Sequence, residues 1–285
     1  MLSELRDEHI TLSEHNADSR RGVPSATDIW AQWIEGAAVV TAVRAGSVAD
    51  VAGLHPGIKV AAVQGVDIER ADAPNGNGVP LVARRIGEER DLGCIRLKNN
   101  LHDAGFVAHF DAALAYLKDT RAMILDLRET QSGGSPAVAR AILGRFIQRD
   151  SPWKARAAHG KAPIVDSVAP RGPFAYRAPL VVLVDRWTAG EGEALAVGLE
   201  SASNATLLGT AMAGLRGELR EVALRHTGIT ARFPAEKSFR IDGTPREAVR
   251  PTVLVDLERP SGGPGDPILY QALKYLETRN GAKPR

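Results

Sequence analysis

Residues 180–193 read Leu-Val-Val-Leu-Val-Asp-Arg-Trp-Thr-Ala-Gly-Glu-Gly-Glu. The first five are apolar and mostly β-branched, which predicts a strand buried on both faces. Thr188 and Glu191 have the Thr-x-x-Glu spacing of a capping box, so we expect a helix over residues 189–201. The unpaired N–H groups in the first turn of such a helix carry partial positive charge and suit an oxyanion. By spacing alone, a well-capped helix with no further role explains the same residues.

A second strand ends in a similar way earlier in the chain. Residues 122–127 read Ala-Met-Ile-Leu-Asp-Leu, and Gly133 and Gly134 follow before a predicted helix at residues 136–146. A glycine pair lets backbone N–H groups face a cleft at little steric cost, although a flexible loop would use the same residues. The alternation of strands and helices predicts an α/β fold with a parallel sheet. In such a fold, functional groups gather at the carboxyl ends of the strands.

The N-terminal part has a different pattern. A strand is predicted at residues 37–43, a short helix at 48–52 and a second strand at 60–63. These elements are too few to bury an independent core, so they predict a small module beside a larger body. A polar, turn-rich stretch at residues 69–79 predicts a solvated connection.

The composition excludes several functional classes. The chain has 285 residues, with 36 basic and 34 acidic side chains that leave a formal charge of +2. That balance gives no electrostatic argument for nucleic acid or a membrane as a partner. Cys94 is the single cysteine, which excludes an internal disulfide and a multi-cysteine zinc site, and the seven histidines lack a metal-ligand spacing. We therefore expect no metal and no organic cofactor.

The compartment stays open on the sequence. No run of about 18 apolar residues is present, so no transmembrane helix is predicted. The N-terminal residues 1–8 read Met-Leu-Ser-Glu-Leu-Arg-Asp-Glu and are too charged for a signal peptide. The protein is therefore cytoplasmic as written, or periplasmic or secreted if a leader has been removed.

Several blocks of the sequence, in order, resemble the tail-specific (C-terminal processing) serine peptidases. Residues 46–57 and 60–66 resemble the PDZ module of that family. Residues 124–128, with the following glycine pair, resemble its first core strand and oxyanion loop, and residues 182–193 resemble the strand and turn that present its nucleophilic serine. Further likeness lies at residues 209–215 and 243–251.

The resemblance covers most of the chain from about residue 36 and implies an architecture. It implies a crotonase-like α/β protease core at residues 89–285, a β-rich PDZ-like module at 25–88 and an N-terminal segment at 1–24 that contributes to the core. It also implies a polypeptide or peptide with a free C-terminus as substrate. The oligomeric state stays open, with a homo-oligomer as one option.

Two catalytic designs occur in the resembled family, and they differ in the base. One pairs the serine with a lysine in the block corresponding to residues 212–217, which here reads Met-Ala-Gly-Leu-Arg-Gly. Arg216 is a poor substitute, because a guanidinium does not deprotonate in proteins. The tricorn-like design uses a histidine and a glutamate, and residues 5–12 resemble its histidine block. The resemblance then implies His9 as general base, Glu247 as the residue that orients it, and N–H groups of Gly133, Gly134 and Glu191 as the oxyanion hole.

The nucleophile position departs from the family. Aligning Glu193 with the family's glutamate places the serine position at Gly190, and glycine has no side chain that can attack a carbonyl. Thr188 is close by, but we expect its hydroxyl to be engaged in the helix cap. Three explanations stay open: an engineered serine-to-glycine exchange, a natural pseudopeptidase, or a site adapted to other acid–base chemistry with His9. A different class, a non-catalytic binder of peptides or apolar small molecules, is favoured by the glycine and opposed by the presence of both His9 and Glu247.

Overall fold

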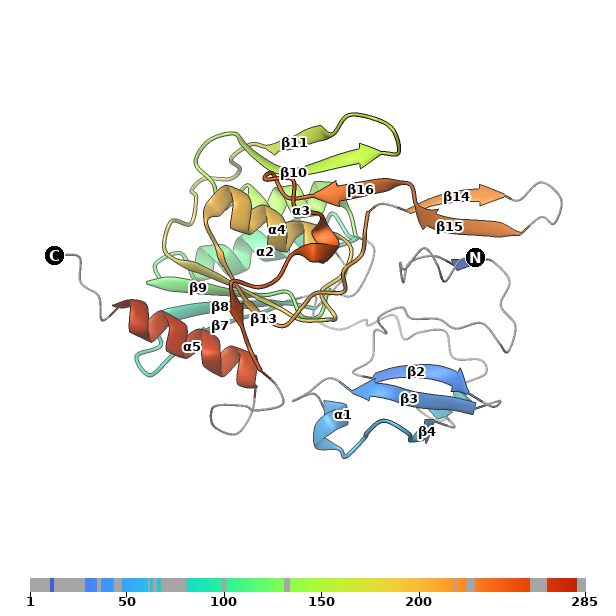
Figure 1. Cartoon of the computed structure of the whole chain (residues 1–285). Coiled ribbons are helices and arrows are strands. Elements are labelled where there is room, and N and C mark those ends of the chain that lie inside the picture. The colour runs from blue at the N-terminus through green and yellow to red at the C-terminus, as the bar shows by residue number, and fades with distance from the viewer. Residues whose placement is uncertain are drawn as a thin grey trace. The chain divides into compact units, whose positions relative to one another are not determined.

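A computed structural model of the chain describes residues 11–12, 29–34, 37–43, 48–60, 62–63, 66–67, 81–98, 101–130, 134–217, 219–223, 229–256 and 266–280 (Figure 1). The chain divides into two compact units. The smaller comprises residues 1–76 and 218–235, and the larger comprises residues 77–217 and 236–285.

The larger unit is built on a six-stranded sheet with the strand order β17-β13-β12-β9-β8-β7. Strands β8, β9, β12, β13 and β17 run parallel, and β7, at one edge, runs antiparallel to β8. Both β9 and β12 are buried along their whole length, which explains their apolar sequences. The bounds are β7 (Leu81–Ile86), β8 (Leu92–Leu97), β9 (Ala122–Asp126), β12 (Leu180–Val184), β13 (Thr206–Gly209) and β17 (Val253–Leu254).

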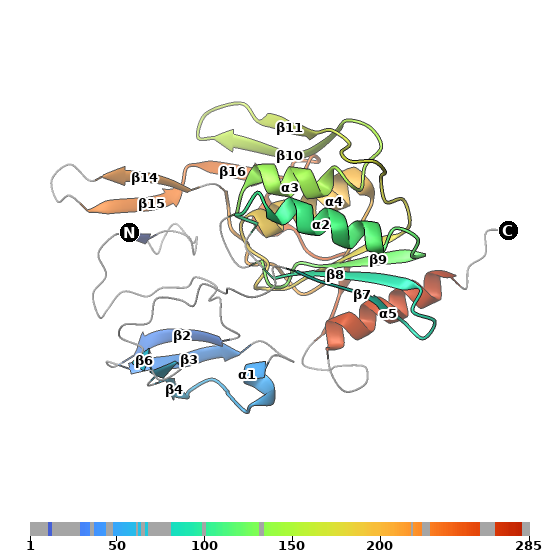
Figure 2. The same cartoon turned by 180° about the vertical axis from the view of Figure 1, so that it is seen from behind.

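Helices cover both faces of this sheet (Figures 1 and 2). On one face, α2 (Phe106–Tyr116), α3 (Pro136–Leu143) and α4 (Glu191–Ser203) form an apolar core with Leu125 and Val182. On the other face, α5 (Pro267–Asn280) packs against Ile124 and Leu183. Each strand contributes to both cores because successive side chains point to opposite faces of a sheet.

A second sheet of the larger unit packs against α4. It is antiparallel, with β10 (Ser151–Ala158) between β11 (Ile164–Val168) and β16 (Glu236–Phe239). Trp153 of β10 is fully buried, and its ring lies so close to Gly198 of α4 that a side chain there would approach it to 2.5 Å. A short 3-10 helix, η3 (Arg246–Ala248), follows β16. This sheet was not predicted, because β10 lacks a clean alternation of apolar and polar residues.

The smaller unit consists of short antiparallel pairings. One sheet contains β2 (Ile29–Ile34), β3 (Ala37–Val43) and β4 (Lys59–Val60), with α1 (Val48–Val51) between β3 and β4 in sequence. A second pairs β5 (Ala62–Val63) with β6 (Val66–Asp67). The third contains β1 (Thr11–Leu12), β15 (Thr230–Pro234) and β14 (Leu219–Ala223). A hairpin from the C-terminal half of the sequence therefore belongs to this unit.

The mixed α/β fold with a parallel sheet is confirmed, and the strands at residues 37–43 and 180–184 have the predicted bounds. One boundary differs: β7 lies within the expected module at residues 25–88, but its full pairing with β8 places it in the core sheet. The PDZ-like character of the module stays a prediction. His9, in the N-terminal segment, lies outside the described residues.

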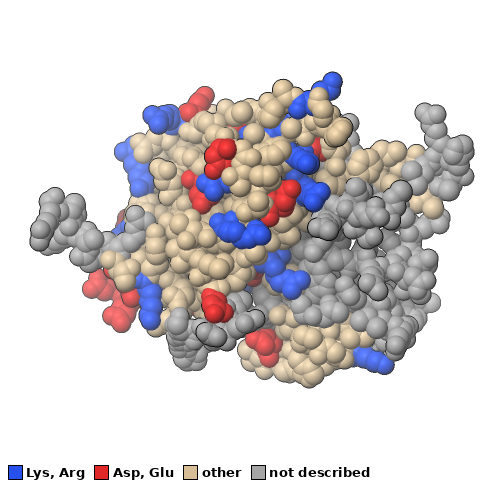
Figure 3. Space-filling model, viewed as in Figure 1, with Lys and Arg blue, Asp and Glu red and all other residues tan. Residues whose placement is uncertain are grey.

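Charge is mixed over the surface. On the face shown in Figure 3, acidic and basic side chains of the described residues are interspersed. Within the described part of the chain, no helix is long and apolar enough to cross a membrane.

Candidate active site at the start of α4

The turn between β12 and α4 places Gly190 at the N-terminus of the helix. Its backbone has φ 59° and ψ −120°, a conformation that L side chains rarely adopt. A sharp, strained turn from strand to helix is also how the nucleophile elbow of α/β enzymes exposes its serine. The backbone here has that form, and residue 190 lacks the side chain.

Glu193 holds this turn from inside the protein. Its fully buried carboxylate accepts the N–H groups of Gly190 at 3.2 Å, Gly214 at 2.9 Å and Leu215 at 3.2 Å. Burial raises the pKa of Glu193 to about 7, against the lowering effect of Arg246 and the three N–H donors. One carboxylate thus links the Gly190 turn to the segment at residues 214–215.

Arg246, buried at the start of η3, completes the same cluster. Its Nε donates to the Leu215 carbonyl at 2.6 Å, and its Nη1 donates to the Gly190 carbonyl at 3.4 Å. The Arg246 Nε also lies 3.9 Å from the Glu193 carboxylate. The contact of Arg246 with residue 190, and those of Glu193 with residues 214 and 215, were not predicted, because no spacing rule connects residues so far apart in the sequence.

Glu247, the expected orienting residue, lies beside this cluster. A side chain on Gly214 would lie 3.9 Å from the Glu247 Cβ, and the Glu247 Oε1 is 3.7 Å from the Arg216 Nε. Among the described residues, no hydrogen bond reaches the buried Oε2 of Glu247. This oxygen is the kind of acceptor that an imidazole N–H would require.

The loop after β9 packs directly against the turn. The Ala189 N–H donates to the Thr130 carbonyl at 2.9 Å. The Leu127 carbonyl accepts the hydroxyl of Thr130 at 2.7 Å and that of Thr188 at 3.2 Å. The loops that follow β9 and β12 are therefore neighbours, since these two strands pair side by side.

Thr188 is not placed to act as a nucleophile. Its side chain is fully buried, and its hydroxyl also accepts the Asp185 N–H at 3.1 Å. The predicted capping box of Thr188 and Glu191 is wrong, because the helix begins two residues later than expected. The capping contact that the structure shows runs from the Gly190 N–H to the Glu193 carboxylate.

Glu191, the first residue of α4, directs its side chain toward β10. Its Oε1 lies 3.9 Å from the Lys154 Nζ, and the two side chains are only 8% and 6% exposed. Lys154 also lies over the Trp153 ring. No motif in the sequence marks Lys154, and only the packing of β10 on α4 brings it here.

Of the predicted site residues, Gly190, Glu191 and Glu247 thus belong to one region of the larger unit. Gly134 lies just before α3 with φ 107°, a value that favours glycine. Gly133 and His9 lie outside the described residues. The catalytic roles of all six predicted site residues stay predictions. No cluster of three or more metal-ligating side chains occurs within the described ranges.

A parallel α/β core in which a strand-to-helix elbow lies beside a second strand-end loop is an arrangement that α/β hydrolases use to expose a nucleophile. Residues 91–255, more than half of the chain, match peptidase family S41. The chain belongs to this family of serine peptidases. No curated protein matches the chain significantly in sequence.

Solved structures share the fold. The photosystem II D1 C-terminal processing protease is 18% identical, with a TM-score of 0.60, over 97% of this chain and 84% of that one. A putative peptidase from Parabacteroides merdae is 17% identical, with a TM-score of 0.61, over 72% and 67% of the two chains. A putative S41 protease from Bacteroides fragilis is 14% identical, with a TM-score of 0.53, over 96% and 83%. At these identities the likeness concerns the fold alone.

Proposed function

We propose that this chain has the catalytic plan of a serine peptidase that cleaves peptide bonds near polypeptide C-termini, with residue 190 at the nucleophile position. Membership of family S41 supports a peptide substrate. The similarity to a C-terminal processing protease supports the position of cleavage. With glycine at residue 190, the chain binds polypeptide and forms no acyl-enzyme.

The elbow at Gly190 is the observation that carries this proposal. The turn has φ 59° and ψ −120°, and the buried Glu193 fixes it through the Gly190 N–H. Arg246 holds the carbonyl of the same residue. Glycine adopts this conformation at little cost, whereas a serine at residue 190 would have to be held in it by contacts such as those from Glu193 and Arg246.

In the serine form, the proposed mechanism assigns a role to each residue. The residue-190 hydroxyl attacks the peptide carbonyl while His9 takes its proton, and His9 then protonates the leaving amine. Glu247, with its buried Oε2 lacking a described hydrogen-bond partner, orients His9. N–H groups of Gly133, Gly134 and Glu191 stabilise the oxyanion. Water then releases the acyl group by the same steps.

The test is the Gly190→Ser variant of the full chain. We expect it to hydrolyse unfolded protein or C-terminal peptides and to form a covalent adduct with a serine-directed phosphonate. An assembled triad and oxyanion site contribute about 10⁶-fold or more to rate, whereas oxyanion binding alone leaves about 10³-fold. The glycine form should therefore show almost no turnover and no adduct.

Gly160→Ser is the matched control, because Gly160 also has positive φ, at +69°, and has open space around it. It should stay unlabelled. If Gly190→Ser is folded but gives neither turnover nor adduct, the peptidase proposal is wrong for this chain.

A second candidate, non-catalytic peptide binding, is favoured by the glycine itself. In that case the glycine form and the Gly190→Ser variant bind peptides with equal affinity. If the PDZ-like module captures the peptide's C-terminus, a peptide with a free carboxylate binds more tightly than the same peptide with a C-terminal amide. Isothermal titration with paired acid and amide peptides tests this. Equal affinity for the two peptides would exclude carboxylate capture.

A further inference from the structure

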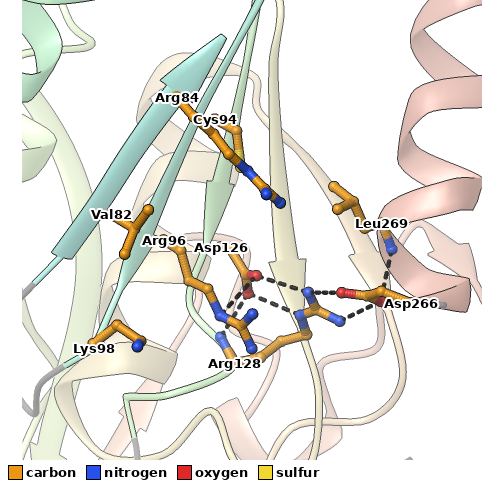
Figure 4. Close-up of a pocket in the computed structure, with 9 residues that line it drawn as sticks. All are labelled: Val82, Arg84, Cys94, Arg96, Lys98, Asp126, Arg128, Asp266 and Leu269. Atoms are coloured by element: carbon orange, nitrogen blue, oxygen red, sulfur yellow. Dashed lines mark hydrogen bonds and ion pairs between the residues drawn. The ribbon is translucent and has the colours of Figure 1, made fainter. Parts of the chain in front are cut away.

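A polar pocket lies on the face of the main sheet that is covered by α5. Its volume is about 130 Å³. Alternate residues of β7, β8 and β9 and the start of α5 form its wall (Figure 4), namely Val82, Arg84, Cys94, Arg96, Lys98, Asp126, Arg128, Asp266 and Leu269. Because α4 covers the opposite face, the pocket is separate from the Gly190 turn.

The strand period explains why so many charges meet here. Residues 94, 96 and 98 point to the same face because side chains alternate along a strand. Arg84 pairs across to Cys94, and Val82 pairs across to Arg96. Lys98 lies about 13 Å along the strand from Cys94. Arg84 and Lys98 therefore flank Arg96, and their long side chains can reach the same central space.

Part of this charge is already neutralised. Arg128 donates to Asp126 at 2.8 and 2.7 Å and to Asp266 at 2.7 Å. The Arg96 Nε lies 3.5 Å from the Asp126 Oδ2, and the Arg96 Nη2 lies 2.6 Å from the Glu129 Oε1. Glu129 is not part of the pocket wall. These contacts fix the floor of the pocket.

Arg84 and Lys98 remain as cations without a carboxylate partner in the described part of the chain. Both are exposed. Arg84 projects over Cys94 toward the centre of the pocket (Figure 4). The Arg96 Nε is buried and makes no hydrogen bond with any described residue. The wall thus has four basic and two acidic side chains. Arg96 and Arg128 contact carboxylates, whereas Arg84 and Lys98 do not within the described ranges.

We propose that this pocket binds a phosphate group, held by Arg84, Arg96 and Lys98. Two cations without partners complement the charge of a phosphate near −2 at neutral pH. Guanidinium donors match phosphate oxygens in a bidentate manner. A cavity of about 150 Å³ accommodates benzene, so the pocket has room for a phosphate group. The proposal does not depend on the peptidase activity.

Isothermal titration of the full chain with inorganic phosphate, at constant ionic strength, is the first measurement. We expect one site. Arg84→Gln and Lys98→Gln should each weaken binding about tenfold or more, because each removes a charge-assisted hydrogen bond. Arg177→Gln and Lys161→Gln are matched controls on exposed positions outside the pocket wall, and they should change the affinity by less than about twofold.

The ligand's charge gives a second, independent measurement. Binding of O-phosphoserine should weaken from about pH 7.5 to about pH 5, because the second pKa of a phosphate monoester is about 6, whereas sulfate binding should not. Burial acts to raise the pKa values of Asp126 and Asp266, but their contacts with Arg128 outweigh it and both pKa values are lowered. Burial raises the pKa of Cys94 to about 11. These wall groups therefore keep their charge over that range.

Two ligands distinguish the sources of phosphate. Binding of O-phosphoserine as tightly as inorganic phosphate would indicate a phosphorylated ligand, and weaker binding would indicate free phosphate. The proposal is overturned if no phosphate compound binds or if acetate binds as tightly as phosphate. It is also overturned if the Arg84→Gln and Lys98→Gln variants bind phosphate with the affinity of the wild type. Gly190→Ser should leave phosphate binding unchanged, which separates this result from the peptidase test.

Discussion

The Thr130 side chain occupies the space that a side chain on Gly192 would need. A Cβ on Gly192 would lie 2.0 Å from the Thr130 hydroxyl oxygen and 2.7 Å from its Cβ. The same Thr130 accepts the Ala189 N–H at its carbonyl. The glycine in the first turn of α4 is therefore required for the contact between the two strand-end loops.

Gly192→Ala should destabilise the protein by about 1–3 kcal/mol, the usual cost of overpacking a buried site. Urea unfolding followed by circular dichroism measures the change. Gly105→Ala is the control, because Gly105 has φ −62° and would meet only the Asp103 side chain, at 3.3 Å or beyond. Equal stability of the two variants would show that the Thr130 contact is not rigid.

The raised pKa of Glu193 predicts a loss of stability with rising pH. Burial moves this pKa from 4.5 to about 7 in the folded protein, so the folded state binds the proton more tightly than the unfolded state. Stability therefore falls as the pH rises from about 4.5 to about 7, by an amount on the order of 3 kcal/mol. Glu193→Gln should remove this pH dependence, so that any change in the free energy of unfolding is the same at every pH in that range. Glu88→Gln, at an exposed position, should keep the slope of wild type.

Arg128→Met should cost about 3–5 kcal/mol in the free energy of unfolding, because it leaves the buried Asp126 without its main partner. Arg128→Lys should cost almost as much, since an ammonium cannot bridge Asp126 and Asp266 as the guanidinium does. Denaturant unfolding at neutral pH tests both variants. Near-wild-type stability of Arg128→Lys would show that charge alone suffices.

Thr188→Val in the Gly190→Ser background should leave phosphonate labelling intact. It removes a hydroxyl that bonds the Leu127 carbonyl and the Asp185 N–H, so we expect a loss of about 1–3 kcal/mol in stability. Mass spectrometry should locate the adduct on residue 190. An adduct that disappears in the Thr188→Val variant would instead make Thr188 the nucleophile.

His9→Ala in the Gly190→Ser background should lower kcat by about 10²–10⁴-fold, the usual contribution of a general base. The matched control is His159→Ala, on the turn after β10. His9→Ala should also remove the lower limb of the pH–rate profile. An unchanged rate or an unchanged profile would exclude His9 as the base.

Local patterns predicted the parts of the fold that local physics decides. The apolar runs of β9 and β12 indicated strands buried on both faces, and the glycines after them marked the two loops that meet at Thr130 and Ala189. The order of strands and helices was enough for the α/β class. Gly190 could be placed at the end of β12 because its position follows from the strand before it and the helix after it.

The contacts that define the site were decided by the tertiary structure alone. Glu193 reaches Gly214 and Leu215, and Lys154 reaches Glu191, across separations that no spacing rule connects. The phosphate pocket forms because β7, which the sequence prediction placed in the N-terminal module, pairs with β8 and brings Arg84 beside Cys94. Hydrophobic periodicity reports which face of an element is buried, and it does not report which element covers that face. That choice depends on long-range pairing and close packing, which the sequence of a single segment does not contain.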